Sequence, residues 1–171
     1  MRQIMVRLTR GALTVGALSG GFLLGNGASA APSLLGGKFS EGTFPLCRTY
    51  GCRVTERRTT PDGALVRLQL QRQDARVLLV LSPYGTVMGL EAWLPGRTTL
   101  SAASRAFLQR VAVQAAEQEL SSERLKTCFA GLEGRASGLR SARLLGGGGE
   151  HYGVVCLRRA GGWGVRVYFD H

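Results

Sequence analysis

The chain has 171 residues, and its 22 lysines and arginines outnumber its 11 aspartates and glutamates, which gives a formal net charge of +11. This length suits one ordinary domain. A composition of 44% hydrophobic and 19% charged residues excludes an intrinsically disordered chain. Four cysteines are too few for a scaffold held together mainly by disulfides. We therefore expect a basic, folded domain with its own hydrophobic core.

The first thirty residues have the pattern of a secretory signal peptide. Three arginines give residues 1–10 a basic start, and residues 11–25 follow as a run of small and apolar side chains. Ala28 and Ala30 then provide the small residues expected before a cleavage site. A membrane anchor is the alternative, but a spanning helix needs about 20 apolar residues, and this run is shorter and rich in glycine. We predict a cleavable signal peptide over 1–30, a secreted or periplasmic protein, and no membrane span after removal.

Export affects the interpretation of the cysteines, because thiols outside the cytosol tend to be paired. Cys47, Cys52, Cys128 and Cys156 allow three pairings. We favour Cys47–Cys52, which closes a small loop, and Cys128–Cys156, which joins a predicted helix to a late predicted strand. A zinc site fits less well, because only one pair is close in sequence. A free, reactive thiol is the remaining alternative, although His151 is expected on the opposite face of a strand from Cys156.

Residues 31–46 are rich in Gly, Pro and Ser without a sustained period, which predicts an irregular N-terminal segment before a single domain over 47–171. Four strands are then expected, over 52–59, 64–72, 77–81 and 86–94. Residues 64–72 alternate between apolar and polar side chains, as a half-buried strand does. Residues 77–81 are apolar throughout, which predicts a central strand covered on both sides. The short turns between these strands predict an antiparallel meander.

The apolar period then changes to that of a helix. Residues 102–120 contain no Gly or Pro and carry apolar side chains at helical spacing. A second, shorter helix is expected after Ser121 and Ser122, which are suitable caps, with Gly134 as its stop.

Period two returns in the last section, which predicts strands over 139–145, 152–159 and 163–169, with the glycine run 146–149 as a loop. The earlier strand over 86–94 contains three candidates for packing, Val87, Leu90 and Trp93. Together these elements predict an α+β domain: an antiparallel β-meander, two central helices packed on one face, and a C-terminal β-hairpin that joins the sheet.

Catalytic signals are weak. The sequence contains no hydrolase elbow, zinc-protease motif or P-loop, so it predicts no cofactor and no metal. His151 lies beside the glycine run, and His171 is the last residue. Glu91 lies in an apolar strand, but no second carboxylate has a spacing that suggests an acid/base pair. The sequence therefore favours a non-enzymatic protein, and a small hydrolase whose site is not visible in sequence stays an alternative.

Positive charge is the most informative surface feature, because 20 of the 22 basic residues are arginine. Arginine forks match phosphates and carboxylates. The candidate anion-binding residues are Arg53, Arg57, Arg67, Arg158, Arg159 and Arg166. If they converge, the partner is an anionic polymer such as a nucleic acid or acidic polysaccharide, a lipid headgroup, or an acidic protein. The alternative explanation for the many arginines is a GC-rich genome, which favours arginine over lysine without any functional reason. We expect a binding or envelope-associated module of otherwise unknown partner, with a basic module for anionic polymers as the sharper alternative.

Overall fold

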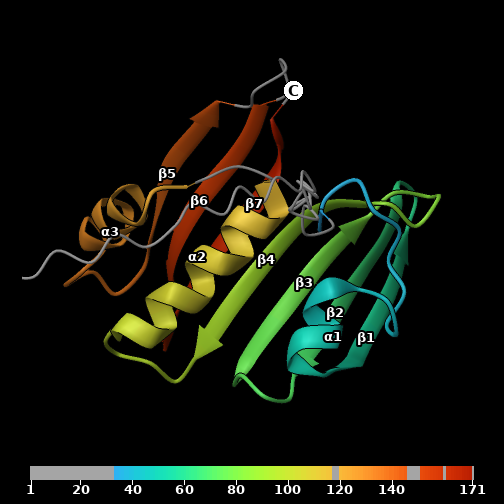
Figure 1. Cartoon of the computed structure of the whole chain (residues 1–171), viewed down its shortest axis with the longest axis horizontal. Helices are drawn as coiled ribbons and strands as arrows, with labels where there is room; N and C mark the ends of the chain where they lie inside the picture. The colour runs from blue at the N-terminus through green and yellow to red at the C-terminus, as the bar shows by residue number, and fades with distance from the viewer. Residues whose placement is uncertain (1–32, 117–119, 146–150, 160, 171) are drawn as a thin grey trace, which may run out of the picture. The chain divides into compact units, whose positions relative to one another are not determined.

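The computed structural model describes residues 33–116, 120–145, 151–159 and 161–170, with the backbone alone for 141–145, 151 and 170 (Figure 1). The predicted signal peptide over 1–30 and the glycine run 146–149 lie outside the described residues. Within the described ranges, no helix is long and apolar enough to cross a membrane.

A seven-stranded antiparallel sheet dominates the described part of the chain. The elements in chain order are α1 (Pro45–Tyr50), β1 (Cys52–Thr60), β2 (Gly63–Leu70), β3 (Ala75–Leu81), β4 (Val87–Pro95), α2 (Ala102–Ala116), α3 (Ser122–Ala130), β5 (Gly138–Leu145), β6 (His151–Arg159) and β7 (Gly162–Asp170). The strand order is β1-β2-β3-β4-β7-β6-β5, so the C-terminal strands extend the first meander through β7. The predicted α+β class with an antiparallel sheet is confirmed, and the sheet is its larger part.

The strand boundaries agree with the sequence predictions to within two residues at each end. The alternation of apolar and polar side chains made this possible in β2 and in the C-terminal strands, because one face of each must be buried, whereas β3 was predicted from its apolar run. Along β2, for example, Val66, Leu68 and Leu70 are buried, whereas Arg67 is exposed. We call the sheet face that carries these buried side chains the buried face.

Helix α2 contacts β4 and β7, and it lies in front of these strands in Figure 1. Phe107, Leu108 and Val111 of α2 are buried in the same core as Val66 and Leu79 of the sheet. The spacing of these three residues puts them on one side of the helix. The core therefore lies between α2 and the buried face.

The prediction that β3 is covered on both sides is wrong. Leu79 is fully buried, but its neighbour Leu78 is only partly buried and Val80 is 43% exposed. Apolar side chains on the second face can be tolerated at partial exposure, because much of any protein surface is apolar. The sequence of β3 alone does not distinguish this case from full coverage.

Helix α1 and the burial of the segment that precedes it were not predicted from the sequence. Leu34, Phe44 and Leu46 are buried in the core, although 31–46 shows no periodic pattern. A helix of six residues is too short to display a helical period, and its main local signal is Pro45 at the first turn.

The cysteines are paired as the sequence favoured. One disulfide joins Cys47 of α1 to Cys52 of β1, and the other joins Cys128 of α3 to Cys156 of β6. Gly51 closes the first of these loops with a φ of 61°, a value that suits glycine. Each disulfide thus ties a helix to a strand, and paired cysteines are typical of proteins in oxidising compartments.

Candidate functional site

The strand register brings distant parts of the chain together on the face of the sheet opposite the buried face. Directly paired residues point to the same side of an antiparallel sheet. One row across the strands consists of Arg53, Gln69, Arg76, Trp93, Gly164 and Leu157. The adjacent row consists of Glu56, Arg67, Leu78, Glu91, Arg166 and Val155. We call these two rows, together with Arg159 of β6, the open face.

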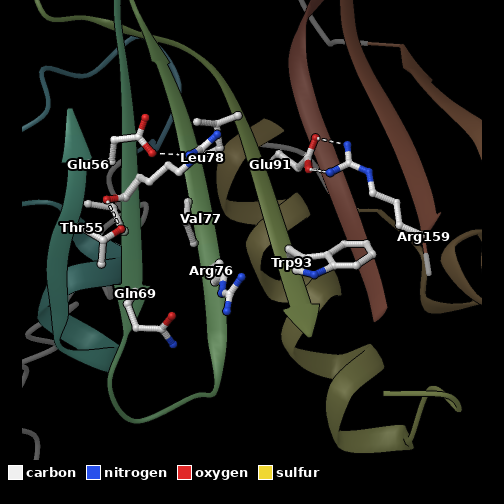
Figure 2. Close-up of a pocket in the computed structure, with 11 residues that line it drawn as sticks. Thr55, Glu56, Gln69, Arg76, Val77, Leu78, Glu91, Trp93 and Arg159 are labelled. Carbon is white, nitrogen blue, oxygen red and sulfur yellow. Dashed lines mark hydrogen bonds and ion pairs between the residues drawn. The ribbon is translucent and has the colours of Figure 1, made fainter. Parts of the chain in front are cut away.

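Glu91 of β4 forms the centre of an ion-pair cluster on the open face. Its Oε2 accepts hydrogen bonds from Arg166 Nη2 at 2.7 Å and Nε at 3.0 Å. Arg159 Nη1 lies 2.7 Å from Glu91 Oε1 (Figure 2). Glu91 is only 8% exposed, so its charge is compensated by these contacts. Because two guanidinium groups share one carboxylate, the cluster retains an excess positive charge.

Trp93 lies on the open face beside this cluster. A Cβ built on Gly162 or Gly164 of β7 would lie 2.6 Å or 2.8 Å from indole atoms, so only glycine lets the ring come this close. The Arg159 guanidinium carbon lies 5.5 Å from the ring centroid, within the range of a cation–π contact. Val87 and Leu90 are in the core as expected, whereas Trp93 is partly exposed and packs against the backbone of β7.

A groove of about 640 Å³ crosses the open face from β1 to Trp93 (Figure 2). It is lined by Thr55, Glu56, Arg67, Leu68, Gln69, Arg76, Val77, Leu78, Glu91, Trp93 and Arg159. Two of its arginines are used internally, because Arg67 is ion-paired with Glu56 and Arg159 with Glu91. Arg76 differs from them: it has no hydrogen bond or ion pair to any described residue. The groove therefore offers one uncompensated guanidinium next to an indole ring.

The structure brings together four of the six arginines that the sequence analysis singled out. Arg67, Arg159 and Arg166 lie on the open face, and Arg53 joins them through its pairing with Gln69. Arg57 pairs with Val66 and so projects from the opposite side of the sheet.

Arg158 has a structural environment that separates it from its neighbour Arg159. Its guanidinium stacks 4.2 Å from the centroid of Trp163 and donates 3.0 Å hydrogen bonds to the backbone oxygens of Arg97 and Thr98. These contacts hold the loop after β4 against β6 and β7. The guanidinium donors of Arg158 are thereby bonded to backbone oxygens.

Arg76, Glu91 and Trp93 are the site residues that sequence reasoning missed. The one local signal was Glu91, a charged residue between the apolar Leu90 and Ala92. Such a residue is rarely buried unless it is paired. Its arginine partners lie 68 and 75 residues away in sequence, so no local pattern could identify them.

The described residues do not test whether the protein has a catalytic site. The side chain of His151 lies outside them, so the hydrolase alternative stays a prediction. Across the described ranges, no group of three or more His, Cys, Asp or Glu residues could hold a metal ion.

Charge distinguishes the open face from an ordinary sheet surface. Its five arginines against two glutamates give it a net charge of +3. Its arginines are exposed, so their attraction for an anionic ligand should weaken as salt screens them. No protein-family model, curated protein or solved structure matches this chain, so the open face itself is the basis on which a function can be assigned.

Proposed function

We propose that this protein is an exported, non-enzymatic binding module that takes an anionic ligand on the open face of its sheet. Export is supported by the basic and apolar pattern of residues 1–30, which we infer to be a cleaved signal peptide. Two disulfides fit the oxidising, periplasmic or extracellular destination that such a peptide implies.

The proposed binding surface requires that both central helices pack on the same side of the sheet. We infer this arrangement from two observations. Helix α2 contacts β4 and β7. Helix α3 is bonded through Cys128 to Cys156, whose register partner Val165 is a fully buried residue of β7. With both helices on the buried face, the open face is left to a ligand.

The observation that carries the proposal is the unpartnered Arg76 in a groove on the open face, whose net charge is +3. A guanidinium group presents paired N–H donors in a fixed plane, which match the two oxygens of a carboxylate or phosphate. The neighbouring arginines Arg67 and Arg159 are each paired with a glutamate, so they shape the groove while their own charges are compensated. Arg76 is then the residue that an incoming anion would engage directly.

The test is the binding of the mature chain, produced by secretion so that both disulfides form, to polygalacturonate and to polyphosphate. We expect affinity that falls steeply with salt, because bound polyanions release their counterions. The double variant Arg53→Gln/Arg76→Gln should weaken binding by about thirtyfold or more, since it removes two charged hydrogen bonds that each contribute about 1 kcal/mol or more.

Arg124→Gln is the control, because Arg124 is an exposed arginine of α3 and does not belong to the open face or line the groove. It should leave the affinity within about twofold of the starting protein, as surface charges contribute little. No binding to either polymer at low salt, or an equal loss in the control and the double variant, would overturn the proposal.

A further inference from the structure

We infer that the anionic ligand is a polysaccharide containing uronic acid units, with one sugar ring stacked on Trp93 and its carboxylate bound by Arg76. This inference rests on the proposed function and adds the class of ligand. It follows from the combination of groups in the groove. A guanidinium group alone would bind any anion. An indole ring beside it selects for a ligand that is also flat and partly apolar.

Trp93 is held in an orientation suited to stacking. Gly162 and Gly164 leave the space in which the indole lies against β7, and any side chain at either position would displace it. The ring therefore has one face against the backbone, and its other face is directed away from the sheet (Figure 2). A fixed aromatic ring costs little conformational entropy when a ligand binds. The C–H face of a pyranose ring is a suitable partner for such a surface.

Arg76 lies directly across from Trp93 in the register of β3 and β4. Paired residues of this kind have Cβ atoms about 5 Å apart. A carboxylate attached to a sugar that stacks on Trp93 can therefore reach Arg76. Arg159 lies on the opposite side of the indole but is compensated by Glu91. The carboxylate is thus directed toward β3.

The same row of the open face continues past Arg76 to Gln69 and then Arg53. From Trp93 to Arg53 the row crosses four strands, a span of about 14 Å at the usual strand spacing. The Gln69 amide can donate to and accept from sugar hydroxyls, and Arg53 can bind a second carboxylate. The row is longer than one sugar, so a polymer lying across the strands fits it better than a monosaccharide.

A single-stranded nucleic acid is the competing ligand, because it also combines negative charge with flat rings. Proteins that bind single strands stack successive bases on several aromatic side chains. Among the residues that line the groove, Trp93 is the only aromatic one. The observations therefore favour the acidic sugar polymer.

The experiment compares four probes on the secreted, mature protein: polygalacturonate, the same polymer after reduction of its carboxyl groups, polyphosphate, and a single-stranded oligonucleotide. We expect polygalacturonate to bind most tightly and the carboxyl-reduced polymer to bind at least about tenfold more weakly, because it lacks the group that Arg76 binds. Trp93→Leu should weaken polygalacturonate binding by about tenfold and leave polyphosphate binding nearly unchanged, since only the sugar stacks.

A second variant keeps the test independent of the packing of Trp93. Arg76→Lys retains the charge but removes the planar fork, so it should weaken polygalacturonate binding severalfold, and Arg124→Lys should not. Polyphosphate or oligonucleotide binding as tight as polygalacturonate binding, with no effect of Trp93→Leu, would reject the acidic sugar and leave the proposed function standing. Failure of every polyanion to bind would reject both.

Discussion

The two faces of the sheet differ although they are built from the same strands. In β3, Leu79 is completely buried while the next residue, Val80, is 43% exposed. The buried face is largely apolar and contacts the core, whereas the open face carries arginines, a tryptophan and a groove. Because side chains alternate along a strand, one sequence can carry stability on one side and recognition on the other. Substitutions on the two faces should therefore have different consequences.

The largest expected effect comes from the disulfide between α3 and β6. Replacing Cys128 and Cys156 together by alanine opens a loop with a sequence separation of 28 residues. In the chain-entropy model, loss of this disulfide lowers the free energy of unfolding by about 3.5 kcal/mol. Loss of the Cys47–Cys52 disulfide, which closes a much shorter loop, lowers it by about 2 kcal/mol. Urea unfolding of the two double variants measures the difference. A larger loss for the Cys47/Cys52 pair would contradict the entropic account.

Adjacent leucines in β3 provide the sharpest comparison of the two faces. Leu79→Ala removes a fully buried side chain and should lower the free energy of unfolding by about 3 kcal/mol. Leu78→Ala, on the open face, removes a partly exposed side chain and should cost about 1 kcal/mol or less. Equal losses in urea unfolding would show that the open face is covered by a packed layer.

The ion-pair cluster gives a smaller effect, because its arginines are partly exposed. Glu91→Gln leaves Arg159 and Arg166 next to each other without their shared carboxylate. We expect a loss of about 1–2 kcal/mol in the free energy of unfolding, since hydrogen bonds to charged groups contribute about this much.

Glu56→Gln is the matched control for Glu91→Gln. Glu56 is ion-paired with Arg67, but its side chain is 48% exposed. Exposed ion pairs contribute little, so the variant should stay within about 0.5 kcal/mol of the starting protein. If the two variants lose the same free energy, burial of Glu91 does not set the strength of its cluster.

The elements of the fold were predictable where the determining signal is local. Alternation, a short apolar run and turn signals predicted the seven strands, and the close spacing of Cys47 and Cys52 suggested the first disulfide. Helix α1 was not predictable in this way, because six residues show no helical period.

The open face depends on long-range register, which no local pattern contains. Arg158 and Arg159 are neighbours in sequence, yet one is held by backbone oxygens and the other pairs with Glu91 on the open face. Likewise, the sequence marked Arg57 and Arg67 equally, although register places only Arg67 beside the groove. Once strand register is known, alternation explains each of these differences.

The central claim is that the open face binds the ligand, and the two tryptophans of the chain allow a direct test. Trp93 borders the groove, whereas Trp163 is 2% exposed on the buried face. Their indole N–H signals can be followed in ¹⁵N–¹H spectra during titration with oligogalacturonate. We predict that the Trp93 signal shifts in a saturable way while the Trp163 signal stays in place. A shift of the Trp163 signal alone, or saturable binding that moves neither signal, would contradict the account.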